Sequence, residues 1–267
     1  MKKVFLMGAL AVCPLLIAQD ASDRITVPFS DPSRPRTLKA NLVNGSITVK
    51  GYEGKEVLID SSGVSAPRHN RKAEAEGLHR IGMSSGLTVE EQDNVVHVTA
   101  FPSGSPHLVI QVPRQISINL RVVNGGFIEV EGVDGEVDAD IVNGPLRVLN
   151  VSGAVVAHAL NGEVKVTMDR MQGNKPMAFS SLNGNVDVTL PADVKAHVKM
   201  KSDHGEMYTD FDVKLEANGK ALVEDGRSSG GRYKVQMDRS LTGTINGGGQ
   251  DLSFTTLNGR IYIRKKK

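Results

Sequence analysis

One dense group of charged residues is spaced so that its members could share the outer side of a β-strand. Glu136, Asp138 and Asp140 alternate with apolar residues, and Arg147 and Lys165 follow in similar patterns. Alternate side chains of a strand point to the same face. Paired carboxylates, or carboxylates with Arg or Lys, are the groups that a polysaccharide lyase or hydrolase would need. Charged strand faces are usually only solvated, so such an enzyme is our alternative and not our main interpretation.

Other catalytic or metal-binding patterns are weak in this sequence. It has no Gly-x-Ser-x-Gly, His-Glu-x-x-His or phosphate-loop pattern. The segment from Gly247 to Asp251 comes near a calcium-binding glycine repeat, but its spacing is wrong and most turns offer one neutral Asn. The seven histidines show no spacing that forces shared ligation on a strand: His69, His79, His97, His107, His158, His197 and His204. We expect no catalytic residues, no cofactor and no metal.

The charged group lies inside a regular repeat that runs from Val123 to Met168. Its glycines are spaced ten, nine, nine and nine residues apart, and each follows Asn, Asp or Ser: Gly125, Gly135, Gly144, Gly153 and Gly162. A short run of alternating apolar and polar residues follows each glycine, as in a half-buried strand. Asn-Gly and Asp-Gly pairs tolerate the positive φ of a tight turn. The repeating unit is therefore one turn plus one strand.

Two all-β folds fit such a unit. Each unit could be half of an 18-residue coil in a β-solenoid, or each Asn-Gly could be a hairpin turn in an antiparallel β-meander or sandwich. Asn-Gly turns alternate with Asp-Gly or Ser-Gly turns, so the full period is two units. We therefore favour the single-stranded β-solenoid. It predicts that Val137 lies one strand spacing, about 4.8 Å, from the strand of Val155, and that Asn124, Asn143 and Asn161 form a hydrogen-bonded column.

The apolar phase of each alternation predicts the core. Eleven side chains should face inward: Ile128, Val130, Val137, Ala139, Ile141, Leu146, Val148, Val164, Val166, Val186 and Val188. The composition suits a narrow core, because aromatic residues make up only 4% of the chain and Trp is absent. A carbohydrate site would usually offer stacking aromatics, and the regular repeats have almost none that face outward.

The chain divides into three parts. Residues 1–18 resemble a signal peptide, because Lys2 and Lys3 precede an apolar run, Val4 to Ile17, too short to span a bilayer. Residues 19–115 form an N-terminal β region with a loop or short helix inserted at 67–80, and residues 116–267 form the regular repeats. We also expect an extended lead-in at 23–36, a hairpin around Asp93-Asn94, an outward bulge at 169–175 and a loop at 218–232.

Charge and cysteine content limit the partners. Loss of Lys2 and Lys3 with the signal peptide would lower the formal charge from +2 to zero, so no global basic field indicates nucleic acid. The run Arg264-Lys265-Lys266-Lys267 either caps an edge or contacts an anionic envelope polymer or lipid. Membrane contact is expected only through this basic terminus or through a lipid on Cys13, the single cysteine.

The repeated Asn-Gly-x-(Ile/Val)-x-Val units, ending Leu257-Asn258-Gly259-Arg260-Ile261-Tyr262-Ile263, resemble the bacterial β-strand-repeat proteins known as putative adhesins. The resemblance covers about Leu38 to Ile263 and implies a right-handed, single-stranded β-solenoid in the cell envelope or outside the cell. That family has no established catalytic residues. The residues that carry the pattern are structural turns: Asn44, Gly45, Asn124, Gly125, Asn143, Gly144, Asn161, Gly162, Asn183, Gly184, Asn258 and Gly259.

These observations predict a non-enzymatic, exported protein of the periplasm, the cell surface or the surrounding medium. It would be adhesin-like and would bind an envelope polysaccharide or a protein partner along one face of the solenoid. The alternative is a polysaccharide-active lyase or hydrolase on the same scaffold, which rests on analogy of fold alone.

Overall fold

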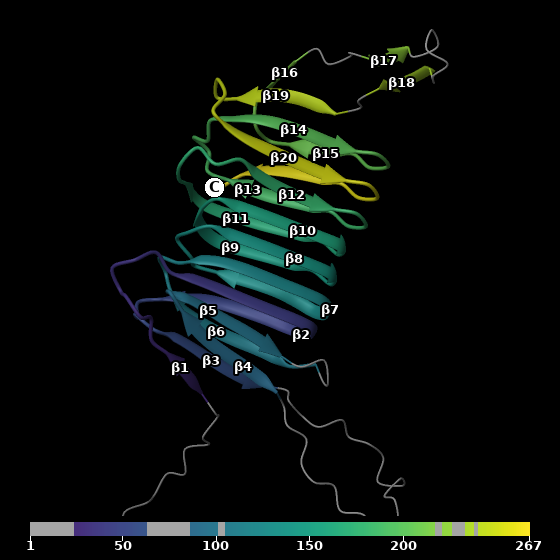
Figure 1. Ribbon diagram of the computed structural model, residues 1–267. Coiled ribbons are helices and arrows are strands. Elements are labelled where there is room, and N and C mark those ends of the chain that lie inside the picture. The colour runs from purple at the N-terminus through teal and green to yellow at the C-terminus, as the bar shows by residue number, and fades with distance from the viewer. Residues whose placement is uncertain (1–23, 63–85, 101–104, 217–220, 226–232, 238–239) are drawn as a thin grey trace, which may run out of the picture.

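The computed structural model describes residues 24–62, 86–100, 105–216, 221–225, 233–237 and 240–267. Every regular element in these residues is a β-strand, which confirms the all-β class (Figure 1). Among them no helix is long and apolar enough to cross a membrane. The strands are β1 (Ile25–Val27), β2 (Thr37–Tyr52), β3 (Val57–Ser62), β4 (Leu87–Gln92), β5 (Val95–Ala100), β6 (His107–Pro113), β7 (Ser117–Glu131), β8 (Val137–Asn143), β9 (Leu146–Gly153), β10 (Val155–Asn161), β11 (Val164–Met171), β12 (Met177–Ser181), β13 (Val186–Leu190), β14 (Ala196–Ser202), β15 (Met207–Thr209), β16 (Val213–Leu215), β17 (Ala221–Asp225), β18 (Tyr233–Met237), β19 (Leu241–Ile245), β20 (Gln250–Thr256) and β21 (Ile261–Lys265).

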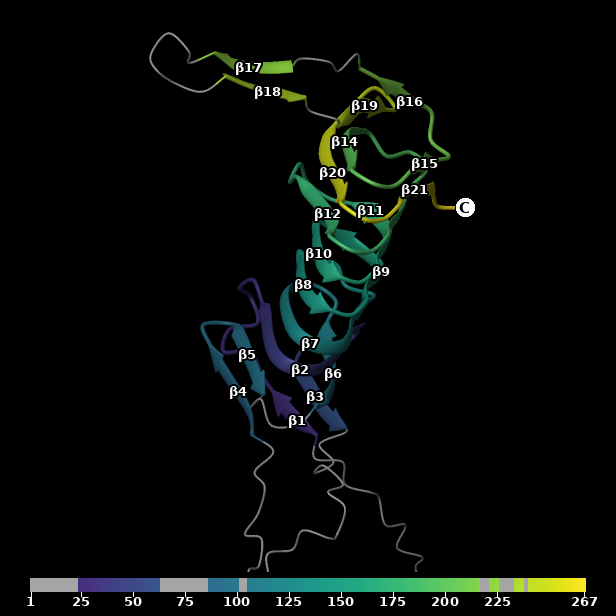
Figure 2. The ribbon, with the colours of Figure 1, turned by 90° about the vertical axis from the view of Figure 1, so that its right-hand side faces the viewer.

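The central strands form two stacked columns of parallel pairs. One column contains the first half of β7, then β8, β10 and β12, and the other contains the second half of β7, then β9, β11 and β13. Val137 pairs with Val155, which confirms the 18-residue spacing expected from the doubled repeat. The antiparallel pairing of β8 with β9 that a meander requires is absent from the described residues. Each coil therefore contributes one strand to each column (Figure 2).

The core lies between the two columns. All eleven side chains predicted to face inward are buried, each with 1% or less of its surface exposed. Apolar and polar residues alternate along β8 and β9, so each strand buries one face and solvates the other. Toward the C-terminal end, the fully buried rings of Phe179 and Phe254 stack with centroids 5.2 Å apart.

At the N-terminal end, chain order and spatial order differ. β2 pairs in parallel with β7 along most of its length, across the predicted boundary at residue 115. Its other edge pairs with β5 and β6, which come later in the chain. Antiparallel strands complete this end: β4 on β5, and β3 with β1 on β6. The expected hairpin at Asp93-Asn94 is confirmed, with φ of 52° and 63° at its two central residues.

The C-terminal end has the same kind of rearrangement. β20 lies between β12 and β14, and β21 lies between β13 and β15. The last coil of the sequence is therefore inserted between two coils that precede it. β19 pairs antiparallel with both β14 and β16, so antiparallel strands complete this end of the stack as well.

Two sequence predictions for smaller segments need comment. The loop expected at 218–232 is wrong for Ala221–Asp225, which forms β17 and pairs antiparallel with β18 in a separate two-stranded sheet. Short runs of strand-favouring residues, such as Leu222-Val223 and Tyr233 to Val235, explain this pairing. The predicted signal peptide, Cys13 and the insertion at 67–80 lie outside the described residues.

Candidate functional site

The predicted turn residues form a column of asparagine amides along one edge of the stack. The Nδ2 atom of Asn143 donates to Oδ1 of Asn124 at 3.1 Å, and Asn161 donates to Asn143 at 2.9 Å. The column continues through Asn183, at 2.7 Å, and Asn258, at 2.8 Å. This confirms the column expected from Asn124, Asn143 and Asn161 and extends it by two members. It lies at the turns after β8, β10 and β12, on the right side of Figure 1.

The glycines of these turns allow the coils to approach closely. Gly144 has a φ of +138°, which side chains rarely adopt. Gly162 has no such φ, but a Cβ atom there would lie 1.9 Å from the carbonyl oxygen of Gly144. Gly184 and Gly259 repeat this close approach on the next coils, and Gly45 and Gly125 do so toward the N-terminal end. The Asn-Gly pair is therefore required by stacking as well as by turn conformation.

A line of apolar side chains runs beside the amide column. In six coils a Val or Leu precedes the Asn, and the strand registers place these residues on neighbouring coils. We call this line the apolar stripe: Val43, Val123, Val142, Leu160, Leu182 and Leu257. Val43, Val123 and Leu182 are exposed at 42%, 43% and 37%, and the others are partly exposed. The stripe and the amide column form a continuous edge, which is the side facing the viewer in Figure 2.

The five charged residues considered for catalysis do not gather in one place. Glu136, Asp138 and Asp140 precede or lie in β8, whereas Arg147 lies in β9 and Lys165 in β11. Consecutive strands belong to different columns, so the acids and the two cations face opposite sides of the stack. The carboxylates instead have other partners. Asn119 donates to Asp138 at 2.7 Å, Arg121 lies 3.5 Å from Asp140, and Lys175 pairs with Glu136.

The Asp138 carboxyl on this face has a raised pKa. Partial burial, and then repulsion from Asp140, raise its pKa above the ordinary value, while Arg121 and Asn119 oppose the shift. On the neighbouring strand β10, His158 pairs in register with Asp140. The Nδ1 atom of His158 lies 2.8 Å from Oγ of Ser180 on the next strand, β12. This row has the residue types of a catalytic triad, but Asp140 is engaged by Arg121 and the row lies on an exposed sheet.

A cluster that sequence reasoning missed lies where β21 and β15 pair. Tyr262 and Tyr208 are neighbours in register, and their rings stack with centroids 5.3 Å apart and planes 9° apart. The guanidinium of Arg264 lies 4.9 Å from the centre of the Tyr262 ring, and its Nε donates to Asp187 at 2.8 Å. We call Glu206, Tyr208, Arg260, Tyr262 and Arg264 the tyrosine cluster. Its two rings are 54 residues apart in sequence, so only the inserted last coil brings them together.

Acids accompany each cation of this cluster. The Arg260 Nε atom lies 3.7 Å from the Glu206 carboxylate, which also accepts a hydrogen bond from the Tyr208 hydroxyl. That bond is the main reason that the pKa of Tyr208 is raised. At the end of β21, Lys266 pairs with Asp169. The basic C-terminal run is therefore partly neutralised by its neighbours, as expected for a solvated edge.

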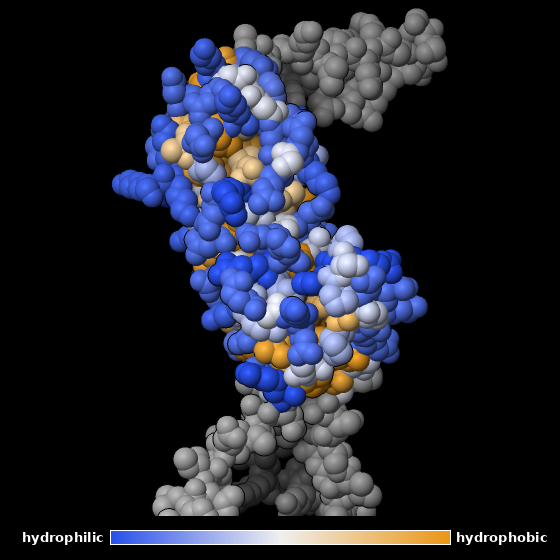
Figure 3. All heavy atoms as spheres, turned by 90° about the vertical axis from the view of Figure 1, so that its left-hand side faces the viewer, coloured by the Kyte–Doolittle hydropathy of each residue, from blue (hydrophilic) through white to orange (hydrophobic). Residues whose placement is uncertain are grey.

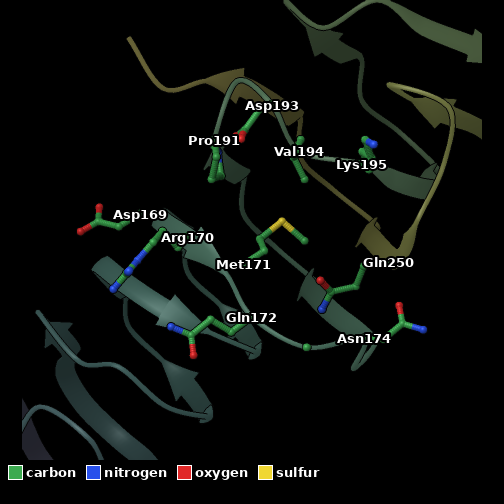
Figure 4. A pocket seen from close by; sticks show the side chains of 11 residues that line it. Asp169, Arg170, Met171, Gln172, Asn174, Pro191, Asp193, Val194, Lys195 and Gln250 are labelled. Carbon is green, nitrogen blue, oxygen red and sulfur yellow. The ribbon is translucent and has the colours of Figure 1, made fainter.

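An open groove of about 450 Å³ lies at the edge opposite the amide column. The turn after β11, where the sequence predicted a bulge at 169–175, forms one wall, and the turn from Pro191 to Lys195 forms another. Met171 points into the centre, below Pro191 and Val194 (Figure 4). The acids Asp169 and Asp193 and the cations Arg170 and Lys195 line the groove. Their charges balance, so the lining does not select a ligand by its net charge. The surface on this side is mostly hydrophilic, with small apolar areas between charged residues (Figure 3).

The histidines and the glycine-rich turn show no common site in the described part of the chain. His69 and His79 fall outside it, and no group of three His, Cys, Asp or Glu residues there could hold a metal ion. His107 contacts Thr48 at 3.0 Å and packs against Phe127. Gly247 and Gly248 have positive φ and form the turn between β19 and β20.

No protein-family model and no curated protein sequence matches this chain. Two solved structures are similar in outline. One is described as a putative cell adhesion protein from Clostridium sporogenes, with 12% identity, a TM-score of 0.38 and coverage of 91% of this chain and 99% of that one. The other is described as a putative adhesin from Bacteroides fragilis, with 11% identity, a TM-score of 0.31 and coverage of 91% and 97%. Similarity at this level assigns neither a family nor a function to the chain.

Proposed function

We propose that this chain is a non-enzymatic, adhesin-like protein of the cell envelope or surface, built as a right-handed single-stranded β-solenoid. It binds an extended partner, an envelope polysaccharide or a protein, along one edge of the stack. The observation that carries this proposal is the apolar stripe, which stays partly exposed over six coils beside the amide column. Contiguous exposed apolar surface on a soluble protein commonly marks an interaction site.

The periodicity of the stripe suits a long partner better than a small one. Six coils each repeat one apolar side chain and one amide, at a spacing of about 4.8 Å. A partner lying along this edge would make the same weak contact several times, and linked weak contacts combine into useful affinity. The division of the acids and cations between two faces also supports binding rather than catalysis.

Export is the second part of the proposal. It rests on the Lys2-Lys3 start and the short apolar run that ends near Ile17. The mature protein would then begin near Gln19. Mass spectrometry of the protein recovered outside the cytoplasm tests this: an intact Met1 terminus or a lipid on Cys13 would contradict it.

The binding edge is tested with a triple variant, Val43→Ser, Val123→Ser and Leu182→Ser, which removes the three most exposed stripe side chains. The matched control replaces three exposed apolar residues elsewhere, Val156→Ser, Leu215→Ser and Leu241→Ser. Cosedimentation with purified bacterial cell walls measures binding. We expect the stripe variant to bind at least about tenfold more weakly, a loss of about 1.4 kcal/mol. Equal binding by the stripe variant and the wild type would refute the assignment of this edge.

A further inference from the structure

We propose that the tyrosine cluster is a carbohydrate subsite that holds one sugar ring against the open face of Tyr208. The subsite lies on the outer face of the second column, at its C-terminal end, and not along the apolar stripe. It therefore goes beyond the proposed function, and either assignment can fail without the other.

The stacking order leaves one aromatic face available. One face of Tyr262 is covered by Tyr208, and the other lies toward β13, where Arg264 reaches across to Asp187. β15 pairs only with β21 among the described strands, so no described strand follows Tyr208 in its column. Tyr208 is accordingly exposed, with 46% of its surface accessible to solvent. The stack presents a flat ring, supported from behind, at the end of a column.

A carboxylate and, next to it, a guanidinium lie at the hydroxyl edge of the Tyr208 ring. The Glu206 carboxylate accepts the Tyr208 hydroxyl hydrogen bond and lies beside Arg260. Both side chains are more than half exposed, so each keeps hydrogen-bonding capacity toward solvent. A carboxylate accepts at several positions, and a guanidinium offers five N–H donors. Together they provide acceptors and donors beside the hydroxyl of Tyr208.

A sugar ring matches this arrangement in chemistry. Its C–H groups form an apolar face that packs on the negative face of an aromatic ring, and its hydroxyls, at the ring edge, both donate and accept. Ligand sites commonly combine an apolar platform with a few placed polar groups that fix orientation.

A protein partner fits the same place less well. Protein interfaces bury a central apolar or aromatic group within a larger well-packed patch. Tyr208 is the single large apolar side chain exposed on this face of the described residues, because the others lie in β1, β10, β16, β19 or the stripe. One isolated aromatic ring among charged side chains favours a small ligand, the size of one ring, that has an apolar face and a polar edge.

The sequence allows a direct optical test. The chain has no Trp and four Tyr, so its intrinsic emission comes from tyrosine. Tyrosine fluorescence and calorimetry are measured on the full mature chain during titration with soluble oligosaccharides of neutral hexoses, N-acetylhexosamines and uronic acids. We expect at least one class to bind with a change in emission. Tyr208→Ala should weaken that binding at least tenfold, and Glu206→Gln several-fold.

Two variants serve as controls. Tyr52→Phe removes a tyrosine hydroxyl in β2, at the N-terminal end and away from the cluster, and should bind within about twofold of the wild type. The stripe triple variant should also keep sugar binding, which separates this subsite from the stripe. Failure of every oligosaccharide class to bind, or equal binding by Tyr208→Ala and wild type, would overturn the proposal. Binding of a protein ligand that depends on Tyr208 without sugar binding would also overturn it.

Discussion

The centre of the molecule and its two ends are built from the same turn-and-strand unit but in different orders. From β7 to β13, each coil stacks on the coil before it in the sequence. At the N-terminal end, β2 lies between β7 and the strands β5 and β6, which follow β2 in the sequence. At the C-terminal end, the coil of β20 and β21 lies between two coils that precede it in the sequence. A local repeat therefore specifies the shape of a coil but not its place in the stack.

Removing residues 250–267 should have the largest effect, and only at one end. β14 and β15 would lose their parallel partners, whereas β7 to β11 would keep theirs. Stacked repeats depend mainly on their nearest neighbours. Hydrogen exchange should show β14, β15 and β19 unprotected and β7 to β11 still protected. Replacing residues 221–237 by a short Gly-Ser linker is the control, because β17 and β18 form a separate sheet. Continued protection of β14 after the truncation would contradict this dependence.

Val148→Asp tests the centre itself. Val148 is fully buried between the columns, where a carboxylate has no partner. An uncompensated buried charge costs about 3–5 kcal/mol, and urea unfolding measures that loss. Arg147→Asp, one position away on the outer side of β9, should have little effect. If both variants unfold at the wild-type urea concentration, the assignment of inner and outer faces is wrong.

Two glycine substitutions compare close stacking at the centre with an open turn at the end. Gly162→Ala would place a Cβ against the Gly144 carbonyl, and overpacking of this kind costs about 1–3 kcal/mol. Gly247 has a φ of +87° but nothing within 4 Å of an added Cβ. Gly247→Ala should then cost only the conformational strain, about 1 kcal/mol. Thermal unfolding would measure both, and a larger loss at Gly247 would show that turn strain outweighs stacking.

The smallest expected effect is a dependence on pH at Asp138. Its pKa is raised in the folded state, so the folded protein binds this proton more tightly than the unfolded chain. Stability from this group is therefore present below the ordinary aspartate pKa of about 3.9 and is lost as pH rises through the higher folded value. Asp138→Asn should raise Tm slightly at pH 7 and leave it unchanged near pH 3. Asp187→Asn, which weakens the acceptor of Arg264 at the C-terminal end, should instead lower Tm slightly at pH 7. A lower Tm for Asp138→Asn at pH 7 would contradict the direction of the shift.

The sequence predicted what depends on neighbouring residues in the chain. The alternation of Val137, Ala139 and Ile141 was enough to assign their burial, and the doubled Asn-Gly pattern was enough to place Val137 beside Val155. Nothing in the local pattern indicates that Val186 pairs with Ile261, 75 residues later. The tyrosine cluster depends on that insertion, so a search for outward aromatics within one repeat could not find it.

The insertion of the last coil also has a consequence for the order of folding. β13 is followed in sequence by β14, yet both strands need β20 and β21 before their edges are paired. Until residues 250–265 have joined the structure, a folding chain would carry an unpaired parallel edge at β12 and β13. Contacts this distant in sequence form slowly, and exposed edges in slow intermediates favour aggregation. The central coils can form early from local contacts, so completion of the C-terminal end should limit the rate of folding.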